Sequence, residues 1–169
     1  MTGPITGSTI GWTTDSTTGV HVRALAEPDH ARWLELWAGY NAFYGRPDLA
    51  AEITEALWTR LFDNREPMGG LVAELDGRVV GIAHYLFHRS TTSVDYVCYL
   101  QDLFTDETVR GRGVGRALIE GVYAAARVAH ASRVYWQTHE TNATAMQLYD
   151  KVAEKSGFVV YRKLFNSAR

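Results

Sequence analysis

Arginines and glycines alternate in one short stretch of the chain, at Arg110, Gly111, Arg112, Gly113 and Gly115. Because glycine has no Cβ, the backbone of this stretch can turn sharply and approach a ligand closely. An amphipathic helix is predicted to follow, and its first N–H groups point outward, toward any anion placed there. Arginines near a helix start oppose the macrodipole, at a cost of roughly 0.3–1 kcal/mol each. A phosphorylated ligand would reverse that effect, so the stretch predicts a phosphate-binding loop.

Two common phosphate-binding motifs are excluded by spacing. A dinucleotide-binding fingerprint has the pattern G-x-G-x-x-G, with an acidic residue about 20 residues later. The third glycine of this chain, Gly115, falls one residue too early for that pattern. A P-loop needs a lysine followed by serine or threonine, and this stretch contains neither pair.

Composition indicates a globular chain. Its 169 residues are 46% hydrophobic and 12% aromatic, which is enough to build a core. The net charge of −2 argues against a general nucleic-acid binder, which would show a basic excess or stripe. No run approaches the length of a membrane-spanning helix. We therefore expect neither a nucleic-acid nor a membrane partner.

Cysteine and histidine usage bears on location and metal binding. Cys98 is the only cysteine, so no disulfide can form within the chain, which fits a reducing cytoplasm. The 6 histidines show no metal-ligand spacing, so no metal site is expected. Residues 1–19 are rich in Thr, Gly and Ser and lack the pattern of a signal peptide. We expect a flexible leader over 1–19, a single domain over 20–169 and a cytoplasmic location.

The hydrophobic pattern predicts alternating strands and helices before the chemistry is considered further. An Asp76-Gly77 dipeptide between two β-rich runs predicts a hairpin. An antiparallel first half followed by a βαβ crossover predicts a mixed sheet. The expected strands are 20–25, 70–75, 78–87, 96–105, 133–138 and 158–165, and the expected helices are 28–44, 49–62, 113–129 and 142–155.

Three motifs, in order, resemble those of the GCN5-related N-acetyltransferases (the GNAT superfamily). Residues 110–115 fit the family pattern Q/R-x-x-G-x-G/A, residues 142–149 resemble N-x-x-A-x-x-L/F-Y, and Ser156-Gly157-Phe158 resembles the usual close. Residues 99–104 look most like diamine acetyltransferases and the small histone/polyamine acetyltransferases of yeast. The resemblance covers about 20–165. It implies an α+β fold, a mixed α/β sandwich whose central, largely antiparallel twisted sheet is flanked by helices.

The resemblance also implies a reaction: the acetyl group of acetyl-CoA moves to a primary amine by direct attack in a ternary complex. The arginine-glycine loop would bind the pyrophosphate, and the Leu103 N–H would stabilise the developing oxyanion. Tyr149 matches the position of the acid that protonates the departing thiolate. The residues implied to contact acetyl-CoA are Leu103, Phe104, Thr105, Arg110, Gly111, Arg112, Gly113, Val114, Gly115, Arg116, Asn142 and Tyr149.

The chain departs from its relatives at the base. Diamine enzymes have glutamate where this chain has Gln101, and glutamine cannot accept a proton. An alkyl ammonium has a pKa near 10.4, so it must lose a proton before it attacks. We expect this proton to be accepted by Asp102, Glu140, His139, a water chain or bulk solvent. Asp102 is equally a candidate for binding a cationic amine.

Aromatic residues recur along the first predicted helix. Trp33, Trp37, Tyr40 and Tyr44 are spaced by four, three and four residues, which places them on one face. We expect this stripe to be core or dimer packing. The helix borders the acceptor cleft in the family, so Tyr40, Tyr44 and Asp102 are the candidate substrate-binding residues.

The acceptor is expected to be a small amine. Two alternatives stay open: a protein-lysine acetyltransferase, and a non-catalytic acyl-CoA-binding module, which Gln101 motivates. A homodimer also stays open, because family members often dimerise.

Overall fold

The structure is a computed structural model that describes residues 14–15 and 18–165. The chain divides into two compact units, residues 1–137 and 138–169. The first unit contains the sheet and the helices that cover it, and the second contains one helix and the segment that follows it. The single domain expected over residues 20–169 stays a prediction.

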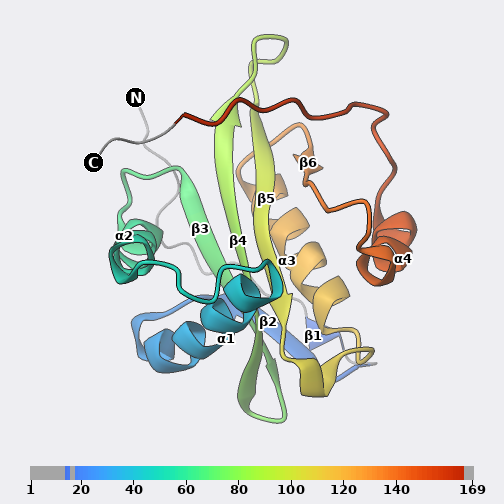
Figure 1. The fold of residues 1–169 in the computed structure, drawn as a ribbon. Coiled ribbons are helices and arrows are strands. Elements are labelled where there is room, and N and C mark those ends of the chain that lie inside the picture. The colour runs from blue at the N-terminus through green and yellow to red at the C-terminus, as the bar shows by residue number, and fades with distance from the viewer. Residues whose placement is uncertain (1–13, 16–17, 166–169) are drawn as a thin grey trace. The chain divides into compact units, whose positions relative to one another are not determined.

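A six-stranded sheet forms the first unit, with strands in the order β1-β2-β3-β4-β5-β6 (Figure 1). Neighbouring strands are antiparallel from β1 to β5, and β5 pairs with β6 in parallel. The prediction of a mixed, largely antiparallel sheet in an α+β fold is confirmed. The strands are β1 (Thr14–Asp15), β2 (Val20–Ala24), β3 (Met68–Leu75), β4 (Arg78–Arg89), β5 (Tyr96–Thr105) and β6 (Val134–Tyr135).

Helices cover both faces of this sheet. The helices α1 (His30–Phe43) and α2 (Ala51–Phe62) lie on one face, and α3 (Val114–Val128) lies on the other (Figure 1). Side chains along β3 alternate between the two faces. Val72 packs in a cluster with Trp33 of α1, whereas the preceding residue, Leu71, lies against Gly121 of α3. The second unit contains α4 (Ala143–Val152).

The turn between β3 and β4 confirms the predicted hairpin. Asp76 and Gly77 both have positive φ, at 53° and 74°, as a two-residue turn of the favoured kind requires. Short 3₁₀ turns precede two helices, at Glu27–Asp29 before α1 and at Glu107–Val109 shortly before α3.

The strand expected over residues 158–165 is wrong. No regular element follows α4 up to Phe165, and the large apolar side chains of this segment are between 63% and 93% exposed. An alternating pattern assigns side chains to faces, but a strand also needs a neighbour that satisfies its backbone. Within the described residues this segment pairs with no strand. The strand expected over 133–138 is similarly reduced to the two residues of β6.

Most of the predicted leader lies outside the described residues, but Thr14 and Asp15 form β1 against β2. In the described part of the chain, no helix combines the length and the apolar character needed to cross a membrane.

Candidate active site

The β5 strand has two different edges over its second half. It pairs with β4 as far as Thr105, but with β6 only at Cys98 and Tyr99. From residue 100 to 105, the edge that faces away from β4 therefore meets no further strand among the described residues. Backbone groups on this edge are open to a ligand, as expected for the strand that would lie beside the pantetheine arm of acetyl-CoA.

One backbone hydrogen bond shows which groups point to the open edge. The Asp106 N–H donates to the Val80 carbonyl across the β4 pairing. Backbone groups alternate along an antiparallel strand, so the N–H and C=O of Leu103 and Thr105 point away from β4. The Leu103 N–H thus faces the side where an oxyanion donor is expected.

A β-bulge at Gln101 interrupts this alternation. His84 pairs with Asp102 and the next residue, Tyr85, pairs with Leu100, which leaves Gln101 as the extra residue. Upstream of the bulge the Cys98 N–H donates to Arg133 beside β6, so the alternation reverses between Cys98 and Asp102. The Gln101 side chain itself is exposed.

Asp102 is a buried carboxylate on the face that α1 covers. Its residue is 7% exposed, and its Oδ2 lies 3.0 Å from the Nδ1 of His84 on β4. The Nε2 of the same imidazole accepts a hydrogen bond of 2.9 Å from the Trp33 indole on α1. The elements α1, β4 and β5 therefore hold the Asp102 carboxylate in place. The side chain of the neighbouring Gln101 is exposed to solvent instead.

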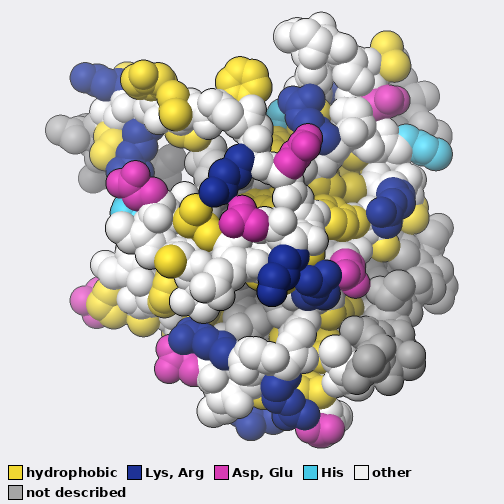
Figure 2. Space-filling model, turned by 90° about the vertical axis from the view of Figure 1, so that its right-hand side faces the viewer, with side chains coloured by type: hydrophobic (Ala, Val, Ile, Leu, Met, Phe, Trp, Pro, Cys, Tyr) yellow, Lys and Arg dark blue, Asp and Glu magenta, His cyan; other side chains and the backbone are white. Residues whose placement is uncertain are grey.

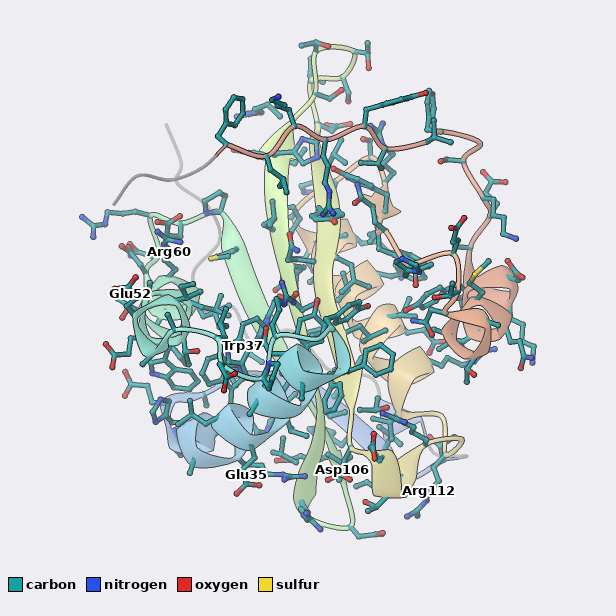
Figure 3. All side chains as sticks on the ribbon, in the orientation of Figure 1. Glu35, Trp37, Glu52, Arg60, Asp106 and Arg112 are labelled. Carbon is teal, nitrogen blue, oxygen red and sulfur yellow. The ribbon has the colours of Figure 1, made fainter. Side chains whose placement is uncertain are left out.

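The aromatic stripe of α1 is core at its start and part of the site at its end. The rings of Trp33, Trp37 and Tyr40 are stacked at centroid distances of 6.0 and 5.3 Å, and all three are buried. Tyr44 packs at 4.9 Å from Tyr40 but is exposed. Figure 3 labels Trp37 on α1. Its indole N–H donates to the Thr54 hydroxyl of α2 at 3.1 Å.

Phe104 joins this end of the stripe. Its ring lies edge-on to Tyr40 at 6.5 Å, and it occupies the space where a Cβ on Gly39 would be, within 2.8 Å. The glycine allows α1 to approach β5 closely. The structure therefore brings together Tyr40, Tyr44, Asp102 and Phe104 from the predicted set.

Three phenols surround the Asp102 carboxylate. Burial and the carboxylate, which also accepts its hydrogen bond, raise the pKa of Tyr40. Burial, followed by the same charge, raises the pKa of Tyr44. The pKa of Tyr99 is raised by burial, by Tyr135 and by Asp102. All three hydroxyls stay protonated at neutral pH, and the Tyr40 hydroxyl donates a hydrogen bond to the carboxylate.

A cleft of 310 Å³ opens next to the exposed end of the stripe. It is lined by residues 45–50, which form the turn between α1 and α2. One of them, Arg46, places its guanidinium 5.8 Å from the ring centroids of both Tyr40 and Tyr44. Among the described residues no carboxylate forms an ion pair with Arg46.

The arginine-glycine loop leads into α3 with two glycines in the left-handed region. Gly111 has φ +80° and Gly113, the N-cap of α3, has φ +84°. The side chain of Val114 is buried, and it anchors the first turn. The first N–H groups of the helix consequently face out of a tight turn, as an anion site requires.

Each arginine of this loop has an exchangeable acidic partner. Arg110 pairs with Glu107 at 3.0 Å, Arg112 with Asp76 at 3.5 Å, and Arg116 with Glu120 at 3.9 Å. Figure 3 shows Arg112 at the same end of the sheet as Asp106. On the face drawn in Figure 2, basic side chains are interspersed with acidic ones. Exposed pairs of this kind are worth about 0–1 kcal/mol, so a phosphate can replace them.

Asp106 connects this loop to α1. Its carboxylate accepts hydrogen bonds from the N–H and the hydroxyl of Thr108, at 3.0 and 2.7 Å, and pairs with Arg32 of α1. Arg32 also donates to the Val79 carbonyl at 2.9 Å. The Thr108 hydrogen bonds and then Arg32 lower the pKa of Asp106 to about 2.

The remaining predicted residues lie in the second unit. Asn142 stands at the N-cap position of α4, where its side chain donates to the Thr138 hydroxyl at 3.3 Å and makes no capping bond. Tyr149 is half-buried on the same helix. His139 and Glu140, two alternative bases, are exposed residues ahead of it.

Sequence reasoning did not identify His84 as part of the site. A histidine inside the apolar run of β4 is the signal that could have drawn attention to it, since buried polar groups need partners. Its partners lie 51 and 18 residues away in the chain. The described residues contain no group of three or more His, Cys, Asp or Glu that could hold a metal ion.

Comparison with known proteins gives a consistent result. Residues 32–153 match the acetyltransferase (GNAT) family. D-amino-acid N-acetyltransferase HPA3 of Saccharomyces cerevisiae is 35% identical over 144 residues, which cover 84% of this chain and 89% of the yeast protein.

Solved structures share the fold. An aminoglycoside acetyltransferase from an uncultured soil metagenomic sample has a TM-score of 0.72 at 21% identity, covering 86% of this chain and 97% of that one. AAC(6')-Iy, in complex with the bisubstrate analogue CoA-S-monomethyl-acetylneamine, has a TM-score of 0.74 at 17% identity, covering 86% and 98%. At these identities the likeness concerns the fold.

Proposed function

This chain belongs to the acetyltransferase (GNAT) family and is an acetyl-CoA-dependent N-acetyltransferase, and we propose that it acetylates the primary amine of a small acceptor by direct attack in a ternary complex. The observation that carries the acceptor proposal is Asp102, a buried carboxylate at the bulge of β5. The next residue, Leu103, directs its N–H to the open edge. An amine bound at the carboxylate would lie one residue from the proposed oxyanion donor.

Asp102 would bind the acceptor as an ammonium ion. A buried carboxylate surrounded by neutral hydroxyls favours a cation strongly, because little water competes for it. The amine must then lose a proton before it attacks, and Asp102 is the group beside it that can accept one. Gln101 has no such capacity, which supports the assignment of the base to its neighbour.

The residues that would hold acetyl-CoA are suited to its parts. The open edge of Leu103 and Thr105 offers backbone donors and acceptors to the amide-containing arm. The outward N–H groups of α3 and the three exchangeable arginines suit the pyrophosphate. Bound there, acetyl-CoA supplies an acetyl group activated as a thioester. We assign to Leu103 the stabilisation of the oxyanion and to Tyr149 the proton for the thiolate sulfur.

An assay of thiol release tests the proposal. Purified protein is mixed with acetyl-CoA and, in turn, polyamines, amino sugars, amino acids and lysine peptides. Turnover of a free small amine above the rate of every peptide is expected. Preference for peptides would indicate a protein-lysine acetyltransferase. Tight acetyl-CoA binding with no turnover would indicate a binding module. Tyr149→Phe should lose turnover while acetyl-CoA binding persists.

A narrower acceptor class, the α-amino acids, is favoured by Arg46. Its guanidinium lies 5.8 Å from the ring centroids of Tyr40 and Tyr44, and the charge of Asp102 acts on the same two phenols. Opposite charges beside one aromatic pair suit a molecule with an ammonium and a carboxylate. The name of the yeast relative, a D-amino-acid N-acetyltransferase, supports testing both enantiomers. Arg46→Gln should raise KM for amino acids more than KM for amines without a carboxylate.

We also propose a homodimer and a cytoplasmic location. Trp33, Trp37 and Tyr40 of the α1 stripe are buried in the core, which favours a dimer surface elsewhere. The exposed apolar side chains of residues 158–165 support a dimer through that segment instead. Light scattering of the full chain tests it, and a monomer at micromolar concentration would contradict it.

A further inference from the structure

His84 is a buried polar residue whose two ring nitrogens are both hydrogen-bonded. It is 1% exposed on β4. Trp33 on α1 and Asp102 on β5 contact its opposite ends, at 2.9 and 3.0 Å. These groups come from three elements that the core fixes relative to one another. The imidazole therefore has little freedom to turn away from either partner.

The Trp33 indole determines where the imidazole carries its proton. An indole N–H can only donate a hydrogen bond, so the Nε2 of His84 must present its lone pair. A neutral imidazole then has its proton on Nδ1, and that N–H donates to Oδ2 of Asp102. A second proton on Nε2 would set two N–H groups against each other. Trp33 thus opposes the cationic form of the ring.

The groups around Asp102 are mostly uncharged. Besides His84, the groups that face the carboxylate are neutral phenols, with one guanidinium beyond them. They are Tyr40 and Tyr44 from α1, Tyr99 from β5 and Arg46 from the α1–α2 turn. A neutral donor at Oδ2 holds the carboxylate without cancelling its charge, whereas a cationic imidazole would compete with an ammonium ion.

We propose that Trp33 and His84 are positioning residues of the acceptor site: the indole fixes the Nδ1–H tautomer, and that tautomer orients Asp102 while leaving its negative charge for the amine. The inference rests on the proposed function. No proton leaves His84 in this role. Trp33 and His84 hold Asp102 in one orientation, and neither of them touches the substrate.

The tautomer is measurable in the wild-type protein without an assay of activity. Nitrogen-15 NMR of the imidazole ring should show a protonated Nδ1 and an unprotonated Nε2 between pH 6 and 8. A ring protonated on Nε2, alone or together with Nδ1, would overturn the proposal.

A matched pair of indole variants tests whether Trp33 and His84 position Asp102 in this way. Trp33→Phe removes the N–H and keeps most of the ring, so Nε2 no longer faces a donor and the imidazole can adopt either tautomer. We expect kcat/KM for the amine to drop about 10-fold, with KM for acetyl-CoA unchanged. Trp37→Phe also shortens a ring that packs against His84, at a centroid distance of 5.5 Å, but the indole N–H that it removes donates to Thr54. Its kcat/KM should therefore stay near the wild-type value.

Two variants of the imidazole give a second test. In His84→Asn the side-chain amide can stand near the Nδ1 position and donate to Asp102, so kcat should recover most of the loss caused by His84→Leu. Equal losses in both variants would contradict the positioning role, as would equal kcat/KM values for the two indole variants. Wild-type protein that acetylates no amine would instead contradict the proposed function.

Discussion

Asp102 and Arg112 would serve opposite ends of the ternary complex, and their surroundings differ in kind. The carboxylate is 7% exposed and held by a buried imidazole, whereas the Arg112 side chain is 52% exposed and pairs with an acid that is itself in solvent. The proposed acceptor end, around Asp102, is preorganised by packing. The proposed nucleotide end, around Arg112, consists of charges that exchange one partner for another.

This contrast indicates how each end should respond to change. A buried group cannot be replaced by water, so its loss should appear in the rate of reaction. An exposed charge is one of several that share a phosphate, so its loss should appear as a small change in affinity. Four experiments test whether the two ends differ in this way.

Asp102→Asn should have the largest effect. The amide keeps the shape and can still accept from His84, but it carries no charge and accepts no proton. We expect kcat/KM for the amine to fall about 10³-fold, with the Kd for acetyl-CoA unchanged. Asp95→Asn, an exposed acid near the β4–β5 turn, is the control. A tenfold rise in the acetyl-CoA Kd would show that the two ends are not separate.

Gly113→Ala should weaken acetyl-CoA binding about 10-fold. The residue has φ +84°, and a Cβ there would lie 3.0 Å from the Thr18 side chain, so the turn must distort at a cost of roughly 1–2 kcal/mol. Gly77→Ala is a matched control with φ +74° and open space around it. Both variants should lose stability, measured by urea unfolding. Only Gly113→Ala should lose affinity in calorimetry.

Arg112→Gln should raise the Kd for acetyl-CoA about 3-fold at low salt, and the difference should shrink at high salt because exposed charges are screened. The melting temperature should stay unchanged. Arg65→Gln, another exposed arginine with an acidic partner, should change neither quantity. A loss of 100-fold or more would mean that the loop is as preorganised as the acceptor end.

Asp106 lies between the two ends. Its substitution should have the smallest effect, a pH-dependent change in the free energy of unfolding. Its folded pKa of about 2 is below the ordinary value of 3.8, so the unfolded chain binds the proton more readily. The carboxylate therefore stabilises the fold above about pH 4, and this contribution is lost as the pH falls toward 2. Asp106→Asn should unfold about 1 kcal/mol more easily at pH 7, and the gap should close near pH 2. Urea unfolding across this range measures it.

Much of the fold could be predicted because its signals are local. Glycine spacing and apolar periodicity placed the third helix at 113–129, and it spans Val114–Val128. Asp76-Gly77 indicated the turn between β3 and β4. The segment 158–165 shows the limit of local signals, because its alternation is that of a strand while the structure leaves it unpaired.

For the proposed acceptor site, the sequence indicated residues that lie close together but not the contacts that connect them. Tyr40, Tyr44 and Asp102 were identified and do lie together. The link from Trp33 through His84 to Asp102 depends on the register of two strands and on how α1 packs over them. Neither is encoded in a short stretch of sequence, so a histidine in an apolar strand could not be assigned partners in advance.

The bulge in β5 gives Gln101 a role that its side chain does not explain. His84 pairs with Asp102 and Tyr85 with Leu100, so Gln101 has no partner on β4. If Gln101 were paired with His84 instead, Asp102 would pair with Ala83, its carboxylate would leave the α1 face and the Leu103 N–H would turn toward β4. The bulge thus acts as a spacer that absorbs one residue without a change of register. Deleting Gln101 should leave Asp102 and Leu103 in their present orientation, whereas pairing it into the ladder would misdirect both.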